Sequence, residues 1–259
     1  MKYKELKGKI ALVTGGTQGI GEAIVEGFAQ EGSQVILNGR RHNEKVQKIL
    51  DRTGADSVMG DISDTQRAKE LVEETVKKYG RIDILVANAA AMSMKPFLEQ
   101  NEEDWWDQIH INLTGHVACL REGVKAMKKT GGGKIVIVSS FFGTIGWKNA
   151  TGYAASKSGL LTLGQYMSRQ YAKDNIDVGI IVPGVIRTPQ LNVDAEDLGI
   201  TYEEVCEMYA GDIAMGRVGD PSEIAEMALF MATRLGGRAL SGRHIQVSGG
   251  EYRTTPYYV

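Results

Sequence analysis

The stretch from Ile10 to Gly21 reads IALVTGGTQGIG: a short apolar run, a glycine-rich turn, and the first residues of a helical pattern. Apolar residues continue at helical spacing as far as Phe28. A strand followed by a glycine turn and a helix N-terminus is typical of a pyrophosphate site, because the exposed N–H groups and the helix dipole favour negative charge. The spacing is G-x-x-x-G-x-G rather than G-x-G-x-x-G. Taken alone, the motif has the alternative of an ordinary glycine-rich turn.

Short apolar runs alternate with helical stretches along the whole chain. This alternation predicts an α/β fold, a doubly wound parallel sheet of the Rossmann type with helices on both faces. We expect about seven strands, near residues 9–14, 34–38, 56–60, 83–88, 133–139, 177–182 and 244–248. No linker-like or repeated segment divides the chain, so residues 1–259 are predicted to form a single dinucleotide-binding domain.

A phenol and an ammonium lie four residues apart in Tyr153-Ala154-Ala155-Ser156-Lys157. On a helix this spacing places both side chains on one face. A fixed cation favours the phenolate, so Lys157 is predicted to lower the pKa of Tyr153 toward neutral pH. Ser140 follows a buried apolar run and can hold a carbonyl oxygen against the tyrosine. For the Tyr-x-x-x-Lys pair alone, the alternative is a solvated helix surface.

Together these motifs make the chain resemble the short-chain dehydrogenase/reductase family, of the short, single-domain type, over nearly its whole length. The resemblance implies hydride transfer by a nicotinamide cofactor and a catalytic tetrad of Asn112, Ser140, Tyr153 and Lys157. It implies that Tyr153 exchanges the proton and that Ser140 binds the same oxygen. It also implies that Lys157 holds the nicotinamide ribose, while Asn112 holds a water that connects the lysine to solvent.

The resemblance also implies which residues bind the cofactor. Asp61, with Ile62, corresponds to the adenine contact, and Asn88 to the end of the fourth strand. The segment from Pro183 to Thr188 corresponds to the part that holds the nicotinamide carboxamide. The expected cofactor-binding set is Gly15, Thr17, Gln18, Gly19, Ile20, Gly21, Arg40, Arg41, Asp61, Ile62, Asn88, Tyr153, Lys157, Pro183, Gly184, Ile186 and Thr188.

The end of the second predicted strand bears on the choice between NADP(H) and NAD(H). Family members that prefer NAD place an acidic residue there, whereas this chain has Gly39 followed by Arg40 and Arg41. A guanidinium can bind a ribose 2′-phosphate through two hydrogen bonds, and a carboxylate would repel it. We therefore expect NADP(H) to be favoured over NAD(H). The alternative is that both arginines are surface charges at the start of the next helix.

Apolar and aromatic residues flank the tetrad. The expected substrate-binding residues are Ser140, Phe141, Phe142, Trp147, Met94 and Tyr153, which suit a hydrophobic or cyclic ketone or secondary alcohol. Residues 189–215 interrupt the strand–helix alternation and are predicted to form a substrate lid over the C-terminal ends of the strands. The alternatives are that some of these aromatics are core residues and that 189–215 is an amphipathic helix pair packed on the core.

Two other functions are consistent with these motifs. One is a 3-oxoacyl carrier-protein reductase, for which basic residues would form a docking face: Lys125, Lys128, Lys129, Arg169 and Lys173. The other is a non-catalytic regulator that senses dinucleotides. Such a regulator would be expected to lose Tyr153 or Lys157, and this chain retains both.

Composition narrows the choice of partners. A formal net charge of −2 disfavours nucleic acid and anionic membranes as partners, and no apolar run approaches the ~20 residues that a membrane span needs. The two cysteines and four histidines show no metal-ligand spacing, so no metal is expected. We expect a cytoplasmic protein that acts on a small-molecule ketone or alcohol.

Two further expectations concern assembly. The protein is expected to be a homotetramer, as is usual in the family, with helices near 101–128 and 151–174 paired across a two-fold axis and Trp106 at the interface. Residues 252–259 include three tyrosines and are expected to pack against the lid or a neighbouring subunit. The alternatives are a partly exposed tryptophan on a monomer and a frayed terminus.

Overall fold

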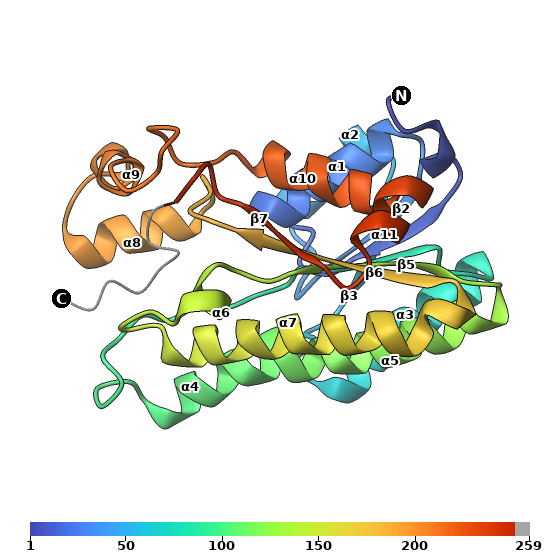
Figure 1. Cartoon of the computed structure of the whole chain (residues 1–259), viewed down its shortest axis with the longest axis horizontal. Helices are drawn as coiled ribbons and strands as arrows, with labels where there is room; N and C mark the ends of the chain where they lie inside the picture. The colour runs from blue at the N-terminus through green and yellow to red at the C-terminus, as the bar shows by residue number, and fades with distance from the viewer. Residues whose placement is uncertain (252–259) are drawn as a thin grey trace.

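A parallel sheet of seven strands forms the centre of the computed structural model, which describes residues 1–251 (Figure 1). The strand order is β3-β2-β1-β4-β5-β6-β7, and all neighbouring strands are parallel. The strands are β1 (Ile10–Val13), β2 (Gln34–Gly39), β3 (Asp56–Met59), β4 (Ile84–Ala87), β5 (Gly133–Val138), β6 (Ile176–Pro183) and β7 (His244–Val247). The predicted doubly wound Rossmann-type fold is confirmed, and each predicted strand is present within two residues of its expected ends.

Helices cover both faces of this sheet. One face carries α3 (Thr65–Tyr79), α4 (Glu102–Ile109), α5 (Gly115–Lys129) and α7 (Thr151–Tyr171); the other carries α1 (Gly19–Gln30), α2 (Glu44–Thr53), α10 (Pro221–Ala232) and α11 (Arg234–Leu240). Short helical turns complete the chain: η1 (Lys4–Leu6), η3 (Ala172–Asp174) and α6 (Phe142–Ile145). The tail at 252–259 lies outside the described residues, so its predicted packing is not tested.

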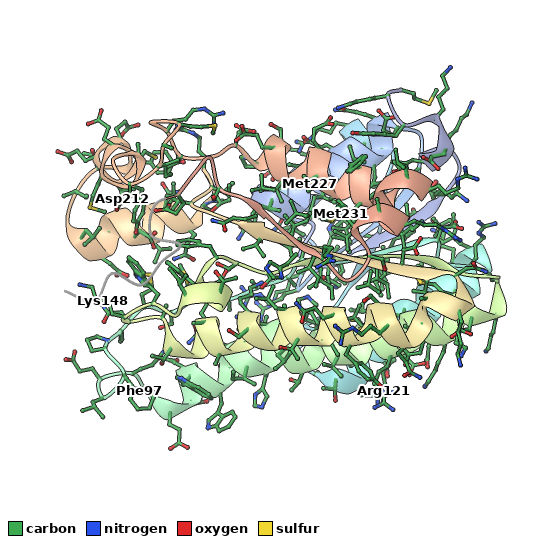
Figure 2. All side chains as sticks on the ribbon, viewed as in Figure 1. Phe97, Arg121, Lys148, Asp212, Met227 and Met231 are labelled. Atoms are coloured by element: carbon green, nitrogen blue, oxygen red, sulfur yellow. The ribbon has the colours of Figure 1, made fainter. Side chains whose placement is uncertain are left out.

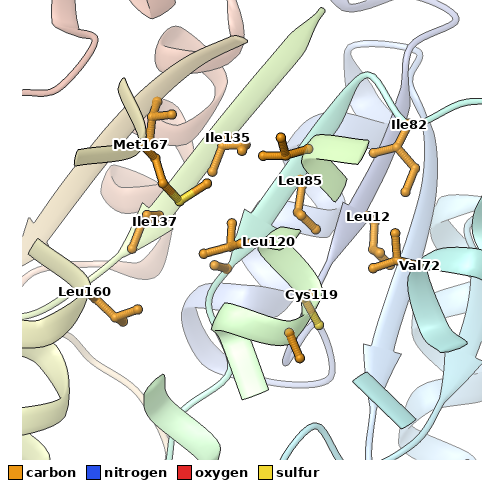
Figure 3. Packing of buried hydrophobic residues seen from close by; sticks show 14 of the residues in the cluster. Leu12, Val72, Ile82, Leu85, Cys119, Leu120, Ile135, Ile137, Leu160 and Met167 are labelled. Carbon is orange, nitrogen blue, oxygen red and sulfur yellow. The ribbon is translucent and has the colours of Figure 1, made fainter. Parts of the chain in front are cut away.

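Successive side chains of the inner strands pack into two separate cores, because successive residues of a strand point to opposite faces of the sheet. Leu12 and Leu85 pack with α3, α5 and α7, as Figure 3 shows for this core. Val13 and Val86, one residue further along the same strands, pack with α1 and α10. Met231 of α10, labelled in Figure 2, is buried in this second core. Burial on both faces explains why inner strands such as β1 and β4 appear in the sequence as continuous apolar runs, whereas the edge strands β3 and β7 are less buried and more polar.

The helix predicted near 101–128 is not continuous. It consists of α4, a π-helical turn η2 (His110–Thr114), and α5. Asn112 lies inside the π turn and is fully buried. Gly115, the first residue of α5, packs directly against the loop after β3, since a Cβ there would be 2.2 Å from the carbonyl oxygen of Ile62. The turn thus presents Asn112 toward the loop that follows β4.

The insertion between β6 and α10 lies beyond one end of the sheet and contains α8 (Gln190–Leu198) and α9 (Tyr202–Ala210) (Figure 1). It follows the C-terminal end of β6, so it lies at the edge where the loops after β1, β4 and β5 also meet. Its two helices enclose a small core of their own, formed by Leu191, Ala195, Val205, Cys206, Ile213 and Val218. Helices α8 and α9 therefore form one side of the crevice where ligands bind in such folds.

Candidate active site

A cavity of about 990 Å³ opens at the carboxyl ends of the strands. It extends from the glycine turn after β1, past the ends of β4 and β5, to the inner side of α8. Every predicted site residue except Asn112 lines it: Gly15, Thr17, Gln18, Gly19, Ile20, Gly21, Arg40, Arg41, Asp61, Ile62, Asn88, Met94, Ser140, Phe141, Phe142, Trp147, Tyr153, Lys157, Pro183, Gly184, Ile186 and Thr188. Residues predicted from widely separated motifs therefore share a single cavity.

The glycine turn is fixed by the neighbouring strand end. The Thr14 hydroxyl oxygen accepts hydrogen bonds from the backbone N–H groups of Asn88 (2.9 Å) and Ala89 (3.2 Å). The Asn88 amide donates in return to the carbonyl oxygens of Thr14 and Gly15, at 3.0 and 3.1 Å. Gly15 has φ +65°, and a Cβ at this position would be 2.6 Å from the Cα of Ala89. Only glycine fits here, and the turn keeps a cradle open for a phosphate group.

Asn38 positions the part of the cavity that lies at the ends of β2 and β3. Asn38, buried at the end of β2, donates to the carbonyl oxygens of Val58 and Gly60, both at 3.1 Å. These bonds hold the end of β3 beside β2, so that Asp61 faces the cavity. The Asp61 carboxylate accepts from the backbone N–H of Ser63 at 2.9 Å, which fixes its orientation.

Lys157 is buried, and its ammonium donates to the carbonyl oxygen of Val138 at 2.9 Å. The Nζ atom lies 5.5 Å from the centroid of the Tyr153 ring. Burial lowers the pKa of Lys157 to about 7, because the charged form loses its hydration. An ammonium has three donors, and a ligand with acceptor oxygens would restore the charged form.

The predicted effect of Lys157 on Tyr153 is wrong for the protein without ligand. Burial raises the pKa of Tyr153 above its ordinary value, and the interaction with the Ser140 hydroxyl lowers it only in part. The sequence shows that a cation is near, but it does not show that phenol and ammonium are withdrawn from water together. Burial therefore favours the neutral form of both the phenol and the amine.

Asn112 does not line the cavity; it lies behind the loop that follows β4. Its side-chain oxygen accepts from the backbone N–H of Ala91 at 2.8 Å, and its Nδ2 donates to the Ala91 carbonyl at 2.9 Å. The same Nδ2 donates to the Ser156 hydroxyl at 3.1 Å, and Ser156 donates to the Tyr153 carbonyl at 2.6 Å. The asparagine therefore ties the β4 loop to the helix that carries Tyr153 and Lys157.

An aromatic wall lies next to Tyr153 in the cavity. The rings of Phe142 and Trp147 are stacked, with centroids 5.0 Å apart and planes inclined by 14°. The Tyr153 ring meets Phe142 edge-on at 6.3 Å. Phe141 lies beneath Phe142, with only 2% of its surface exposed, and belongs mainly to the core. The predicted aromatic set is thus present, but Phe141 supports the wall more than it exposes a surface.

The contribution of His116 was not predicted from the sequence, and within the predicted lid at 189–215 neither Gln190 nor Asp194 was identified as a lining residue. His116 is fully buried and contacts both Thr14 and the backbone of Asn112. Gln190, Asp194 and Tyr209 line the cavity from the insertion. One signal was available: Asp194 lies between Leu191 and Leu198 on the apolar stripe of its helix, where a carboxylate is unusual.

Comparison with known proteins agrees with this geometry. Residues 9–198 match the model of the short chain dehydrogenase family. The chain belongs to the short-chain dehydrogenase family. It is therefore an oxidoreductase and an enzyme, and the family uses NAD(H) or NADP(H) with small-molecule substrates.

This short-chain dehydrogenase has relatives with several substrates. It is 35% identical over 249 residues to a 3-oxoacyl-acyl-carrier-protein reductase of Thermotoga maritima, which covers 95% of this chain and 98% of that protein. It is 33% identical over 254 residues to L-rhamnose-1-dehydrogenase of Scheffersomyces stipitis, covering 95% and 96% of the two chains. The L-sorbose reductase of Gluconobacter frateurii, solved with NADPH and L-sorbose, has a TM-score of 0.88 at 27% identity, covering 95% of this chain and 97% of that one.

Among residues 1–251, every helix is too short or too polar to span a bilayer. Across the same residues there is no cluster of three or more His, Cys, Asp or Glu side chains placed to hold a metal ion.

Proposed function

We propose that this short-chain dehydrogenase transfers a hydride between NADP(H) and a hydrophobic or cyclic ketone or secondary alcohol. The observation that carries the proposal is the single cavity that joins the glycine turn to Ser140, Tyr153 and the Phe142–Trp147 wall. A planar apolar wall favours a substrate with an apolar ring or chain.

The residues fit a dinucleotide. A Cβ at Gly15 would clash with the backbone of Ala89, so glycine is needed to hold the turn in this shape, and the buried Lys157 ammonium uses one of its three donors on Val138. When bound, the nicotinamide supplies or takes up the hydride. In the reduction direction the Tyr153 hydroxyl donates the proton to the substrate oxygen. The Ser140 hydroxyl donates a hydrogen bond to the same oxygen, and Lys157 holds ribose hydroxyl groups.

Preference for NADP(H) is supported by the end of β2. Arg40 and Arg41 are exposed and line the cavity, and within residues 1–251 neither guanidinium forms an ion pair. At Gly39 a Cβ would lie 2.3 Å from the Cγ2 of Thr17, so an acidic side chain at this position would require Thr17 to move. Arg40 is therefore proposed to bind the 2′-phosphate.

The second candidate, a 3-oxoacyl carrier-protein reductase, is favoured by the identity of several relatives. The basic residues expected to form a docking face for a carrier protein give this candidate little support. Lys128 pairs with Asp174 at 3.1 Å, and Lys125 pairs with Glu122 at 2.6 Å. Both lysines lie near the end of α5, which leads into the amino end of β5, whereas the cavity lies at the carboxyl ends of the strands.

A substrate panel tests both candidates. Cyclic ketones, secondary alcohols and carrier-bound 3-oxoacyl chains are offered with each nicotinamide cofactor, and the nicotinamide absorbance is followed. We expect the highest kcat/KM with a cyclic ketone and NADPH. Higher efficiency with the carrier-bound chain than with any free ketone would establish the second candidate.

We also propose a homotetramer in the cytoplasm. Trp106 of α4 is 47% exposed, and a large half-exposed aromatic is better accommodated at an interface than in water. Cys119 and Cys206 are free thiols, as in reducing compartments. Light scattering at micromolar concentration checks the assembly, and a monomeric mass would reject it.

A further inference from the structure

The cavity has walls of different character. The wall formed by Phe142 and Trp147 is aromatic and apolar. The opposite wall belongs to the insertion, where Gln190 and Asp194 of α8 and Tyr209 of α9 line the same cavity. An apolar substrate alone gives no reason for a carboxylate, an amide and a phenol on this wall.

Asp194 is held in a fixed orientation by its neighbours. Its Oδ1 accepts from the Gln190 Nε2 at 3.0 Å, and its Oδ2 accepts from the Tyr209 hydroxyl at 3.1 Å. Only 7% of the residue is exposed. Burial raises the pKa of Asp194, because the charged form loses part of its hydration. The two bonds occupy one acceptor position on each oxygen, and each oxygen can accept a further hydrogen bond.

Within residues 1–251, no cation pairs with the Asp194 carboxylate. Its recorded partners there are the neutral Gln190 and Tyr209, and the neighbouring charge is that of Asp197. A buried carboxylate with spare acceptor positions is most stable when further donors reach it. A substrate hydroxyl entering the cavity supplies such a donor without adding a charge to be buried.

We propose that Asp194, oriented by Gln190 and Tyr209, recognises a hydroxyl group of the substrate away from the reacting carbon. The preferred substrate class is then a hydroxylated ring: its apolar face lies on the Phe142–Trp147 wall and a rim hydroxyl donates to Asp194. This inference rests on the proposed function, because it assigns a specificity determinant to the same cavity.

A purely structural role for Asp194 predicts different results. The Asp194–Tyr209 bond joins α8 to α9, so loss of this link could disturb the insertion as a whole. A structural defect would lower activity toward all ring ketones in the same proportion. Loss of hydroxyl recognition would lower activity mainly toward hydroxylated ones, so the ratio between two matched substrates separates the two roles.

The test compares cyclohexanone, methylcyclohexanone, the hydroxycyclohexanone isomers and aminocyclohexanone in the intact enzyme. We expect one hydroxycyclohexanone isomer to have a higher kcat/KM than its methyl analogue. In Asp194→Asn, that ratio should fall about tenfold to a hundredfold, the range expected when a charge-assisted hydrogen bond is lost. Asp197→Asn, an exposed acid on the same helix, removes the same charge and should retain the wild-type ratio.

Three outcomes would overturn the proposal: an unchanged ratio in Asp194→Asn, an equal loss on all ring ketones, or a stronger preference for aminocyclohexanone than for the hydroxylated ring. A binding measurement keeps the inference separate from the proposed function. Cyclohexanediol should bind more tightly than cyclohexanol by ligand-detected NMR, and Asp194→Asn should remove the difference. If that holds while no ketone is turned over, the proposed function fails and the hydroxyl subsite stands; equal binding of the two rings rejects the subsite.

Discussion

Thr14 and His116 are separated by 102 positions in the chain, yet the Thr14 Oγ1 lies 3.2 Å from the His116 Nε2. The other ring nitrogen, Nδ1, lies 2.9 Å from the carbonyl oxygen of Asn112. A carbonyl only accepts, so Nδ1 carries the proton and Nε2 is an acceptor; the single proton of the Thr14 hydroxyl lies within reach of both Nε2 and the Val86 carbonyl oxygen, which is 3.1 Å from Oγ1. A neutral imidazole thus joins the glycine turn to the π turn that carries Asn112.

The first prediction concerns this histidine. Burial and the nearby Lys157 ammonium lower the pKa of His116 to about 4, against 6.5 for the exposed group. Between these pH values the imidazole is protonated in the unfolded chain but not in the folded chain. The free energy of unfolding therefore falls as pH decreases from about 6.5 to about 4. The loss is at most on the order of 3 kcal/mol, at 1.36 kcal/mol per pKa unit.

Denaturation of wild type and His116→Asn over this pH range measures the contribution. The variant should lose less stability than wild type as pH falls. His110→Asn, an exposed histidine of the same π turn, is the matched control and should follow the wild-type profile. Parallel profiles for wild type and His116→Asn would show that the imidazole is not held neutral.

The second prediction concerns the proton donor. Tyr153→Phe keeps the ring against Phe142 and removes only the hydroxyl. We expect kcat to fall about 10²–10⁴-fold, as for loss of a general acid, while the Kd for the cofactor changes little. Tyr166→Phe, 59% exposed on the same helix, should retain wild-type kcat. Turnover near the wild-type level in Tyr153→Phe would contradict the proposed mechanism.

The third prediction concerns the buried ammonium. Lys157→Met should abolish turnover and, at pH 7, raise the free energy of unfolding of the cofactor-free protein. Folding lowers the pKa of Lys157 from 10.5 to about 7, so wild type loses stability as pH falls through this interval. The gain should be on the order of 2 kcal/mol or more and should shrink as pH approaches 10. Chemical denaturation at several pH values checks it; a less stable variant at pH 7 would show that the ammonium is well accommodated.

The fourth prediction concerns the phosphate. Arg40→Ala should weaken NADP(H) binding by about 1.5–3 kcal/mol, the energy of a charge-assisted hydrogen bond, and leave NAD(H) binding nearly unchanged. Titration calorimetry with both cofactors measures the difference. Lys48→Ala, an exposed basic residue of α2 paired with Glu44, is the control. Equal weakening of both cofactors, or a wild type that prefers NAD(H), would show the assignment to be wrong.

Sequence patterns predicted the centre of the sheet well because its inner strands are buried on both faces. Ile135 and Val136 point to opposite cores, and so the whole strand is apolar and easily recognised. The start of α10 also has local signals in the sequence: Asp220 caps the helix, Pro221 begins it and Glu223 completes the capping box. These signals depend on residues that are neighbours in the chain, so they can be recognised without knowing the tertiary contacts.

Features that depend on tertiary contacts were not predicted. Ser63 and Gln66 have the spacing of a capping box before α3, but the adjacent Asp64 caps the helix by accepting from the backbone N–H of Gln66 at 2.8 Å. The π turn around Asn112 adds a single residue to a helical repeat, which periodicity does not resolve. The raised pKa of Tyr153 and the polar side of α8 both follow from burial by distant segments.

The separate small core of the insertion has a consequence for how such an enzyme can change. Helices α8 and α9 are held together by their own apolar side chains and by the Asp194–Tyr209 bond, while the glycine turn and Lys157 belong to the body of the sheet. We therefore expect that residues 189–215 can be exchanged as a unit, by recombination or in the laboratory, when the backbone hydrogen bonds of Ala214 and Met215 to Gly250 and Gly249 are kept. A new substrate range could then evolve without redesigning the parts that bind the dinucleotide.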